Sequence, residues 1–297
     1  MQTDMNPRTA VADSLSPAAA YRKPALSGRD MLFSLGSLLV IAIVVQMFYA
    51  AIIRPRAEII LARAEQAEQT QAPQTRSQAA TGGNELRSIW VILKDYEQET
   101  AIILALWAIG LIGYQAHTTA RGRRLLEKRY IDVDENHVVL PEDTRAYGRP
   151  LERLPEEERQ MLVPRALMVG LNRFGATRSV QDAAEAVINE CEYEAARLES
   201  QLSMIRFTAW AIPAIGFVGT VRGIGVALQE AKFALHGDIS GVTAGLGVAF
   251  NSTLVALVLA ILLMFFIHQL QQAQDKLVLE ARAYVDRNLL RHMRVFS

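Results

Sequence analysis

The sequence predicts an all-α membrane protein with four transmembrane helices, the third and fourth of which continue into long cytoplasmic helical extensions. Two observations predict this fold class. Apolar residues make up 51% of the 297 residues and are concentrated in four runs, and a run of about 20 such residues crosses the hydrocarbon core as a helix. The polar segments flanking the third and fourth runs have a helical pattern.

The first run, residues 31–53, carries no charge. It is longer than the apolar core of a signal peptide, about 7–15 residues, so we predict an uncleaved first span. Residues 1–30 are polar and proline-containing, which predicts a disordered cytoplasmic arm. Residues 54–99 are predicted to lie outside, beginning as a helix (AEIILARAEQAEQ) and continuing as a Gln/Thr/Ser-rich stretch. The shorter second run, 100–116, is predicted to be the second span.

The second half of the chain begins with a polar cytoplasmic segment, 117–206. We expect residues 130–158 to be loop-like and the chain to be helical from Pro164, with Ser179 as a helix N-cap. The remaining segments are predicted as a third span at 207–226, a short outer link at 227–244, a fourth span at 245–267 and a basic cytoplasmic C-terminal helix at 268–297.

Lysine and arginine give the orientation. They gather before the first run, after the second run (RGRRLLEKR, Arg121 to Arg129) and after the fourth, whereas the link between the third and fourth runs has only Lys232. Because basic residues mark the cytoplasmic side, both termini are predicted to be cytoplasmic.

Charge and residue usage exclude several classes. The 31 basic and 31 acidic residues balance, which gives no reason to expect a nucleic-acid partner. The single cysteine, Cys191, allows no internal disulfide and is expected to be a free thiol on the reducing side. The five histidines are scattered, so we expect no metal site and no cofactor.

The stretch GFVGTVRGIG, Gly216 to Gly225, has neither phosphate-loop pattern. A hinge stays open beside a helical interpretation. In a helix, Gly216, Thr220 and Gly223 share one face with Pro213, and Gly219 forms a Gly-x-x-x-Gly pair with Gly223. Small residues of this kind mark close helix packing in membranes.

The fourth run also has small residues and a hydroxyl on one helical face. Ala249, Thr253, Ala256 and Ala260 recur at helical spacing, with Asn251 and Ser252 beside them. The alternative interpretation is simple packing, with each hydroxyl bonded to its own backbone. None of the four runs contains Asp or Glu, so if this chain conducts ions, another chain must supply the titrating group.

Arg222 is the one charge inside an apolar run. Counted from Phe207, it lies about 22 Å along the helix, near the outer end. It is either an interfacial anchor or a salt-bridge candidate, with a partner chain, Asp238 or Glu230 as the counter-ion.

Both motifs resemble the MotA/TolQ/ExbB proton channel family. The third run, PAIGFVGTVRGI, is similar to its Pro-x-x-Gly-(Leu/Phe)-x-Gly-Thr-Val-x-Gly motif, and GLGVAFNSTLVAL is similar to its second motif. The resemblance covers roughly Val163 to the C-terminus. Two departures stand out: the outer segment 54–99 is longer than the first loop of a flagellar stator, and Asn251 and Ser252 make the second motif imperfect.

The resemblance implies a homo-pentamer in the bacterial inner membrane around a single-span MotB/TolR/ExbD-like partner with a transmembrane aspartate. It implies that Thr220 and Thr253 are ion-pathway residues, with Ser252 and Asn251 beside them, and that Pro213 lies near the inner mouth. Gly216, Gly219, Gly223, Ala249 and Ala256 are the expected packing or partner-facing residues.

The resulting prediction is a non-enzymatic motor subunit that conducts H⁺ or Na⁺ and contacts membrane lipids. A non-conducting oligomeric scaffold is the alternative, and a transporter subunit coupled to a separate ATPase is a third, weaker one.

Overall fold

The computed structural model describes residues 28–70, 89–131 and 138–295. Within this part of the chain, four helical stretches are long and apolar enough to cross a membrane: Leu35–Arg63, Tyr96–Leu125, Val180–Ala234 and Ser240–His292. The predicted all-α membrane fold with four such helices is confirmed. The predicted disordered arm and the Gln/Thr/Ser-rich stretch fall almost entirely outside the described residues.

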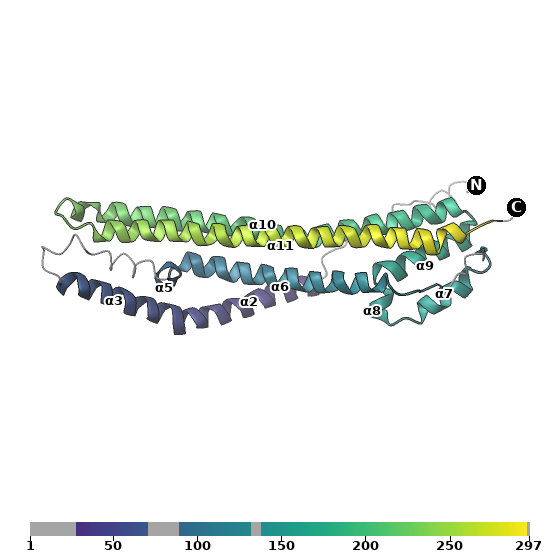
Figure 1. Cartoon of the computed structure of the whole chain (residues 1–297), viewed down its shortest axis with the longest axis horizontal. Helices are drawn as coiled ribbons and strands as arrows, with labels where there is room; N and C mark the ends of the chain where they lie inside the picture. The colour runs from purple at the N-terminus through teal and green to yellow at the C-terminus, as the bar shows by residue number, and fades with distance from the viewer. Residues whose placement is uncertain (1–27, 71–88, 132–137, 296–297) are drawn as a thin grey trace, which may run out of the picture.

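Two long antiparallel helices, α10 (Val180–Ala234) and α11 (Ser240–Asn288), run the length of the molecule (Figure 1). At 1.5 Å per residue they measure about 80 and about 75 Å, so each extends well beyond a bilayer of about 40–45 Å. The turn between them contains Gly237 at φ 91°, a left-handed conformation that glycine adopts without strain. We call the end of the molecule with this turn the hairpin end, and the opposite end the α9 end.

The first membrane helix is longer than its apolar run. Helix α2 (Gly28–Phe48) continues through a π-helical turn, η3 (Tyr49–Ile53), into α3 (Arg54–Thr70). The predicted helix at the start of the 54–99 segment is therefore confirmed. Short α5 (Ile89–Ile92) and long α6 (Tyr96–Leu125) follow, and α3 and α5 lie toward the hairpin end (Figure 1).

Three apolar cores hold these helices together. One joins the first helix to α5 and α6 through Val45, Tyr49 and Ile53. A second lies between α6, α10 and α11, where Ala101, Ala105 and Ala108 present a small face of α6 to the hairpin. The third lies at the α9 end, so the molecule has packed interiors both along and beyond its apolar helices.

The α9 end is where the sequence-based expectation was wrong. The segment expected to be loop-like up to Glu158 contains α7 (Thr144–Glu152) and α8 (Glu156–Arg159). Although the sequence of this segment is mostly polar, Tyr147 and Leu151 lie one turn apart on α7. Both pack into the apolar core formed with α9 (Leu162–Thr177). Tertiary burial overrides weak local propensity here. The short 3₁₀ turn η5 (Leu290–His292) follows α11 at the same end.

The predicted N-cap at Ser179 is confirmed. Its hydroxyl accepts a hydrogen bond from the backbone N–H of Asp182 at 3.2 Å, which satisfies one of the free donors at the start of α10. The preceding Arg178 adopts φ 53°, so the chain reverses sharply between α9 and α10.

Candidate functional site: a hydroxyl pair in the helical hairpin

Three glycines, Gly216, Gly219 and Gly223, allow α10 to pack closely against α11. The Gly216–Gly225 stretch is helical throughout. A Cβ on Gly223 would lie 2.5 Å from the backbone nitrogen of Ala249, and one on Gly216 would lie 2.6 Å from the Cβ of Ala256. No larger residue fits without moving backbone. These contacts lie within one chain. They use the small residues of α10 and α11 that were expected either to pack together or to face a partner.

Thr220 and Thr253 meet at this interface. Their hydroxyl oxygens are hydrogen-bonded to each other. Thr220 Oγ1 also lies 3.2 Å from the carbonyl oxygens of Gly216 and Ala249, and Thr253 Oγ1 lies 3.3 Å from that of Gly216. Both side chains are half-buried. The fold thus brings together the two threonines predicted from separate motifs, 33 residues apart.

An exposed apolar wall surrounds the hydroxyl pair. Phe217 and Ile224 lie about one turn before and after Thr220 on α10, and Phe250 and Leu257 are placed in the same way around Thr253 on α11. All four side chains are exposed in the single chain. Exposed large apolar side chains beside a polar pair mark a surface that lipid or another helix covers.

The other predicted polar residues separate from this pair. Ser252 is buried, donates a hydrogen bond to the Val248 carbonyl oxygen at 2.8 Å, and accepts one from Gln98 Nε2 at 3.4 Å. It therefore faces α6. Asn251 and Pro213 are both half-buried on their helices.

Arg222 pairs with α6. Its guanidinium binds Glu97 through two contacts, Nε to Oε1 at 2.7 Å and Nη2 to Oε2 at 2.8 Å, and lies 3.8 Å from Asp95 Oδ1. The salt bridge that the sequence assigned to Asp238, Glu230 or a partner chain is thus made with two acids that were not considered. Burial raises the pKa of the Asp95 carboxyl above its ordinary value, although Lys94 and Arg222 act in the opposite direction.

Another acidic residue, Glu99, lies just before the second apolar run and is also buried. The carboxylate of Glu99 is buried, and its Oε2 accepts a hydrogen bond from Arg54 at 2.7 Å. The other oxygen, Oε1, is buried without a hydrogen-bond partner, as is the hydroxyl of Tyr49. Sequence reasoning missed Gln98 and Glu99 because it began the second run at Thr100. The signal available was the spacing of Gln98 with Ala101 and Ala105 on one helical face.

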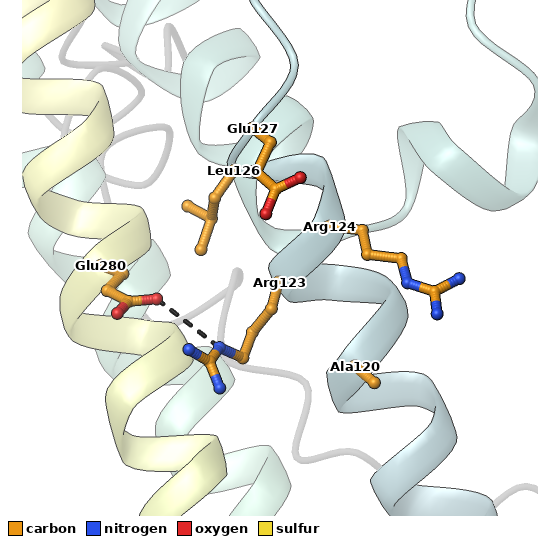
Figure 2. A pocket seen from close by; sticks show the side chains of 6 residues that line it. All are labelled: Ala120, Arg123, Arg124, Leu126, Glu127 and Glu280. Atoms are coloured by element: carbon orange, nitrogen blue, oxygen red, sulfur yellow. Dashed lines mark ion pairs between the residues drawn. The ribbon is translucent and has the colours of Figure 1, made fainter.

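An open groove at the α9 end has a different character. It has a volume of about 320 Å³ and lies between α6 and α11. Figure 2 shows Arg123 of α6 reaching toward Glu280 of α11 across it, 3.7 Å apart, with Arg124 and Glu127 on the α6 side. Two arginines and two glutamates balance, so the groove has no net attraction for an anion. Among the described residues, no group of three His, Cys, Asp or Glu side chains is placed to hold a metal ion.

These features define a multi-pass α-helical membrane protein whose hairpin presents a pair of hydroxyls within an apolar surface. Residues 159–283 match the family model of the MotA/TolQ/ExbB proton channel family. The matched range contains α9, α10 and most of α11, and therefore the hydroxyl pair. The match falls in the region where the motifs predicted this family, and it supports a membrane function of the ion channel or motor type. No curated protein and no solved structure matched the chain.

Proposed function

We propose that this chain is the ion-conducting subunit of a bacterial inner-membrane motor, and that it works with a single-span partner carrying a transmembrane aspartate. The observation that carries the proposal is the half-buried Thr220–Thr253 pair inside the family-matched hairpin. The pair supplies hydroxyls and the partner supplies the carboxylate. The chain itself does no small-molecule chemistry.

The surroundings of the pair suggest how it acts. A charged carboxylate is costly against the apolar wall of Phe217, Ile224, Phe250 and Leu257. The two hydroxyls stabilise it at one position by hydrogen bonding. Protonation or Na⁺ binding removes the net charge and its desolvation penalty. The partner helix then moves past the wall, and release of the ion on the inner side resets the cycle.

The proposed orientation places the hairpin end outside the membrane and the α9 end in the cytoplasm, with both termini cytoplasmic. The exposed leucines and valines of α2 then face lipid. In the proposed assembly, five copies surround two partner helices, so that each copy presents its hydroxyl pair to the centre.

Ion flux tests the proposal. The chain is purified with its partner from the native host, reconstituted into liposomes, and assayed with an internal pH- or Na⁺-sensitive dye. We expect the double variant Thr220→Val with Thr253→Val to lower flux at least tenfold, because valine keeps the shape and removes both hydroxyls. Thr208→Val is the matched control, since Thr208 is buried on the same helix and bonds only its own Met204 carbonyl oxygen. Unchanged flux in the double variant overturns the proposal.

One observation favours the alternative, a non-conducting scaffold. Both threonine hydroxyls already have backbone acceptors within the chain, as a packing role requires. Native mass spectrometry of the gently solubilised protein separates the two functions. A pentamer with two copies of a single-span protein supports the motor, and a different oligomer, or a pentamer without that protein, supports the scaffold.

A further inference from the structure

Gln98 is the most completely buried polar side chain near the hydroxyl pair. It lies in the first turn of α6, is 0% exposed, and donates from Nε2 to Ser252 Oγ at 3.4 Å. Its carbonyl oxygen, Oε1, is buried and has no hydrogen-bond partner. The side chain sits where α6 meets the hairpin, above a core that is otherwise alanine and aliphatic.

An amide oxygen in this state is unfavourable unless something donates to it. Leaving a buried acceptor unsatisfied costs about 1–3 kcal/mol, and such groups in native proteins are usually satisfied by water or an ion. A leucine of similar size would fill the same space at no such cost. The amide oxygen therefore points to a visiting partner: water or hydronium, which would donate a hydrogen bond to it, or a small monovalent cation, which it would coordinate.

Polar groups continue on both sides of Gln98. Toward the hairpin end, the neighbouring Glu97 binds Arg222 at the surface. On the side of Gln98 that faces α10 and α11, Gly219 is where α10 lies closest to both α11 and α6. A Cβ on Gly219 would lie 2.5 Å from Ser252 Oγ and 3.1 Å from Glu97 Cγ. Gly219 and Ser252 each immediately precede a member of the threonine pair. A line of polar groups thus runs from the surface ion pair to Gln98 and Ser252, and Thr253 is the next residue after Ser252 on α11.

We propose that this line is an entry route within the subunit, between α6, α10 and α11, with Gln98 as a binding point for water-borne protons or monovalent cations on their way to the hydroxyl pair. The proposal rests on the proposed function for its destination. The Arg222–Glu97 pair lies at the surface end of this line, and Gly219, which has no side chain, packs closely against Ser252.

Silver ion is a probe of suitable size and charge for this route. Gln98→Cys is compared with Ala105→Cys, which lies two turns deeper on the same face of α6 and is 2% exposed in the apolar core. Ag⁺ is added to the hairpin-end side of sealed membranes containing the full complex. Thiols that remain free are then labelled with maleimide in SDS and quantified by mass spectrometry, with buried Cys191 as the internal reference.

We expect Ag⁺ to protect at least half of the Gln98→Cys thiols while Ala105→Cys and Cys191 remain fully labelled. Equal labelling of the two introduced cysteines overturns the route. This readout needs no ion flux, so it decides the route even if the chain does not conduct.

Flux provides a second measurement. We expect Gln98→Leu to lower flux at least tenfold and Gln98→Glu to retain most of it. The control is Gln274→Leu, which removes another buried amide that contacts α6, at Gln115 (3.4 Å), about 32 Å along α11 from Thr253. Wild-type flux in Gln98→Leu, beside the loss expected in the double threonine variant, overturns the route and leaves the proposed function intact.

Discussion

At the scale of single residues, neighbouring positions of the α10 glycine stretch do different things. Gly223 is in contact with the backbone of α11, whereas a Cβ on Gly225, two residues later, would meet nothing within 4 Å. The sequence offers both as small residues of one motif. Only the contact geometry separates the glycine that permits close approach from the one that merely lacks a side chain.

Alanine at these two positions should have opposite effects. We expect Gly223→Ala to destabilise the folded protein by about 1–3 kcal/mol, because the added methyl group overpacks the helix interface. Gly225→Ala should be neutral or stabilising by up to about 1 kcal/mol, since alanine favours a helix. Thermal unfolding of the detergent-solubilised protein measures both. Equal destabilisation would show that α10 and α11 are not packed as described.

The lone thiol should be unreactive in the folded protein. Cys191 is 3% exposed in the core at the α9 end, and burial raises its pKa to about 11. Thiolate is the reactive form, so at pH 8 we expect iodoacetamide to label Cys191 at least tenfold more slowly in the native protein than in SDS. Rapid labelling of native protein would indicate that this core opens readily.

At the scale of helices, α10 depends on local interactions at its start as well as on its apolar face. Ser179 caps its first turn, and Arg165 of α9 reaches across to two acids of α10, Glu190 and Glu194. This end of α10 lies outside the predicted span, where water competes for hydrogen bonds and ordinary soluble-protein rules apply.

Removal of the cap should therefore have a measurable cost. We expect Ser179→Ala to lower stability by about 1 kcal/mol, because the N–H of Asp182 loses its acceptor. Ser203→Ala is the matched control in the same helix, since Ser203 is exposed and bonds only the Ser200 carbonyl oxygen. If both variants lose the same stability, the Ser179 cap is not formed.

The buried acid of this helix should give an acid-dependent stability. Burial alone would raise the pKa of Glu194, but hydrogen bonds from Arg197 and Arg165 outweigh it and hold the pKa below its ordinary value of 4.5. A lowered pKa in the folded state stabilises the protein above about pH 4.5, and that contribution is lost as the pH falls through the folded value.

Unfolding temperatures measured from pH 7 downward test this dependence. We expect the wild type to lose more stability in acid than Glu194→Gln does. Glu199→Gln, at a side chain that is 72% exposed, should keep the wild-type profile. Parallel curves for wild type and Glu194→Gln would contradict a lowered pKa.

At the scale of the whole molecule, α6 connects the two halves of the chain. It packs its alanine face on the hairpin and bears Glu97 and Glu99, which bind Arg222 of α10 and Arg54 of α3 respectively. These ion pairs lie at the hairpin end, while the alanine face lies along the bundle. Together they fix both the depth and the rotation of α6 against α10 and α11.

Charge exchange should reveal the Arg222–Glu97 contact. We expect Arg222→Glu to lower stability by about 1 kcal/mol or less, because Arg222 is 43% exposed and solvent screens the pair. Adding Glu97→Arg should restore most of the loss, and high salt should shrink the difference. The same exchange at the exposed pair Arg291 and Asp286 is the control. Failure of the second change to rescue the first would argue against the pair.

Much of the fold could be predicted because the bilayer imposes simple requirements on sequence. Four apolar runs indicated four helices, since a spanning segment must satisfy its backbone hydrogen bonds internally. Ser179 was predicted as an N-cap from its residue type and position. Thr220 and Thr253 were named from two motifs, each readable at helical spacing within its own run.

By itself, the sequence determined the four long apolar helices, the family region and the two threonine motifs, because these depend on residues close together along the chain. Only the tertiary structure decided which groups meet: Thr220 with Thr253, Arg222 with Glu97, and Gln98 with Ser252. It also turned a polar stretch into α7 through the burial of Leu151. The physical reason is that contacts between distant segments depend on how helices rotate and slide against each other, and that packing is set by the whole molecule at once.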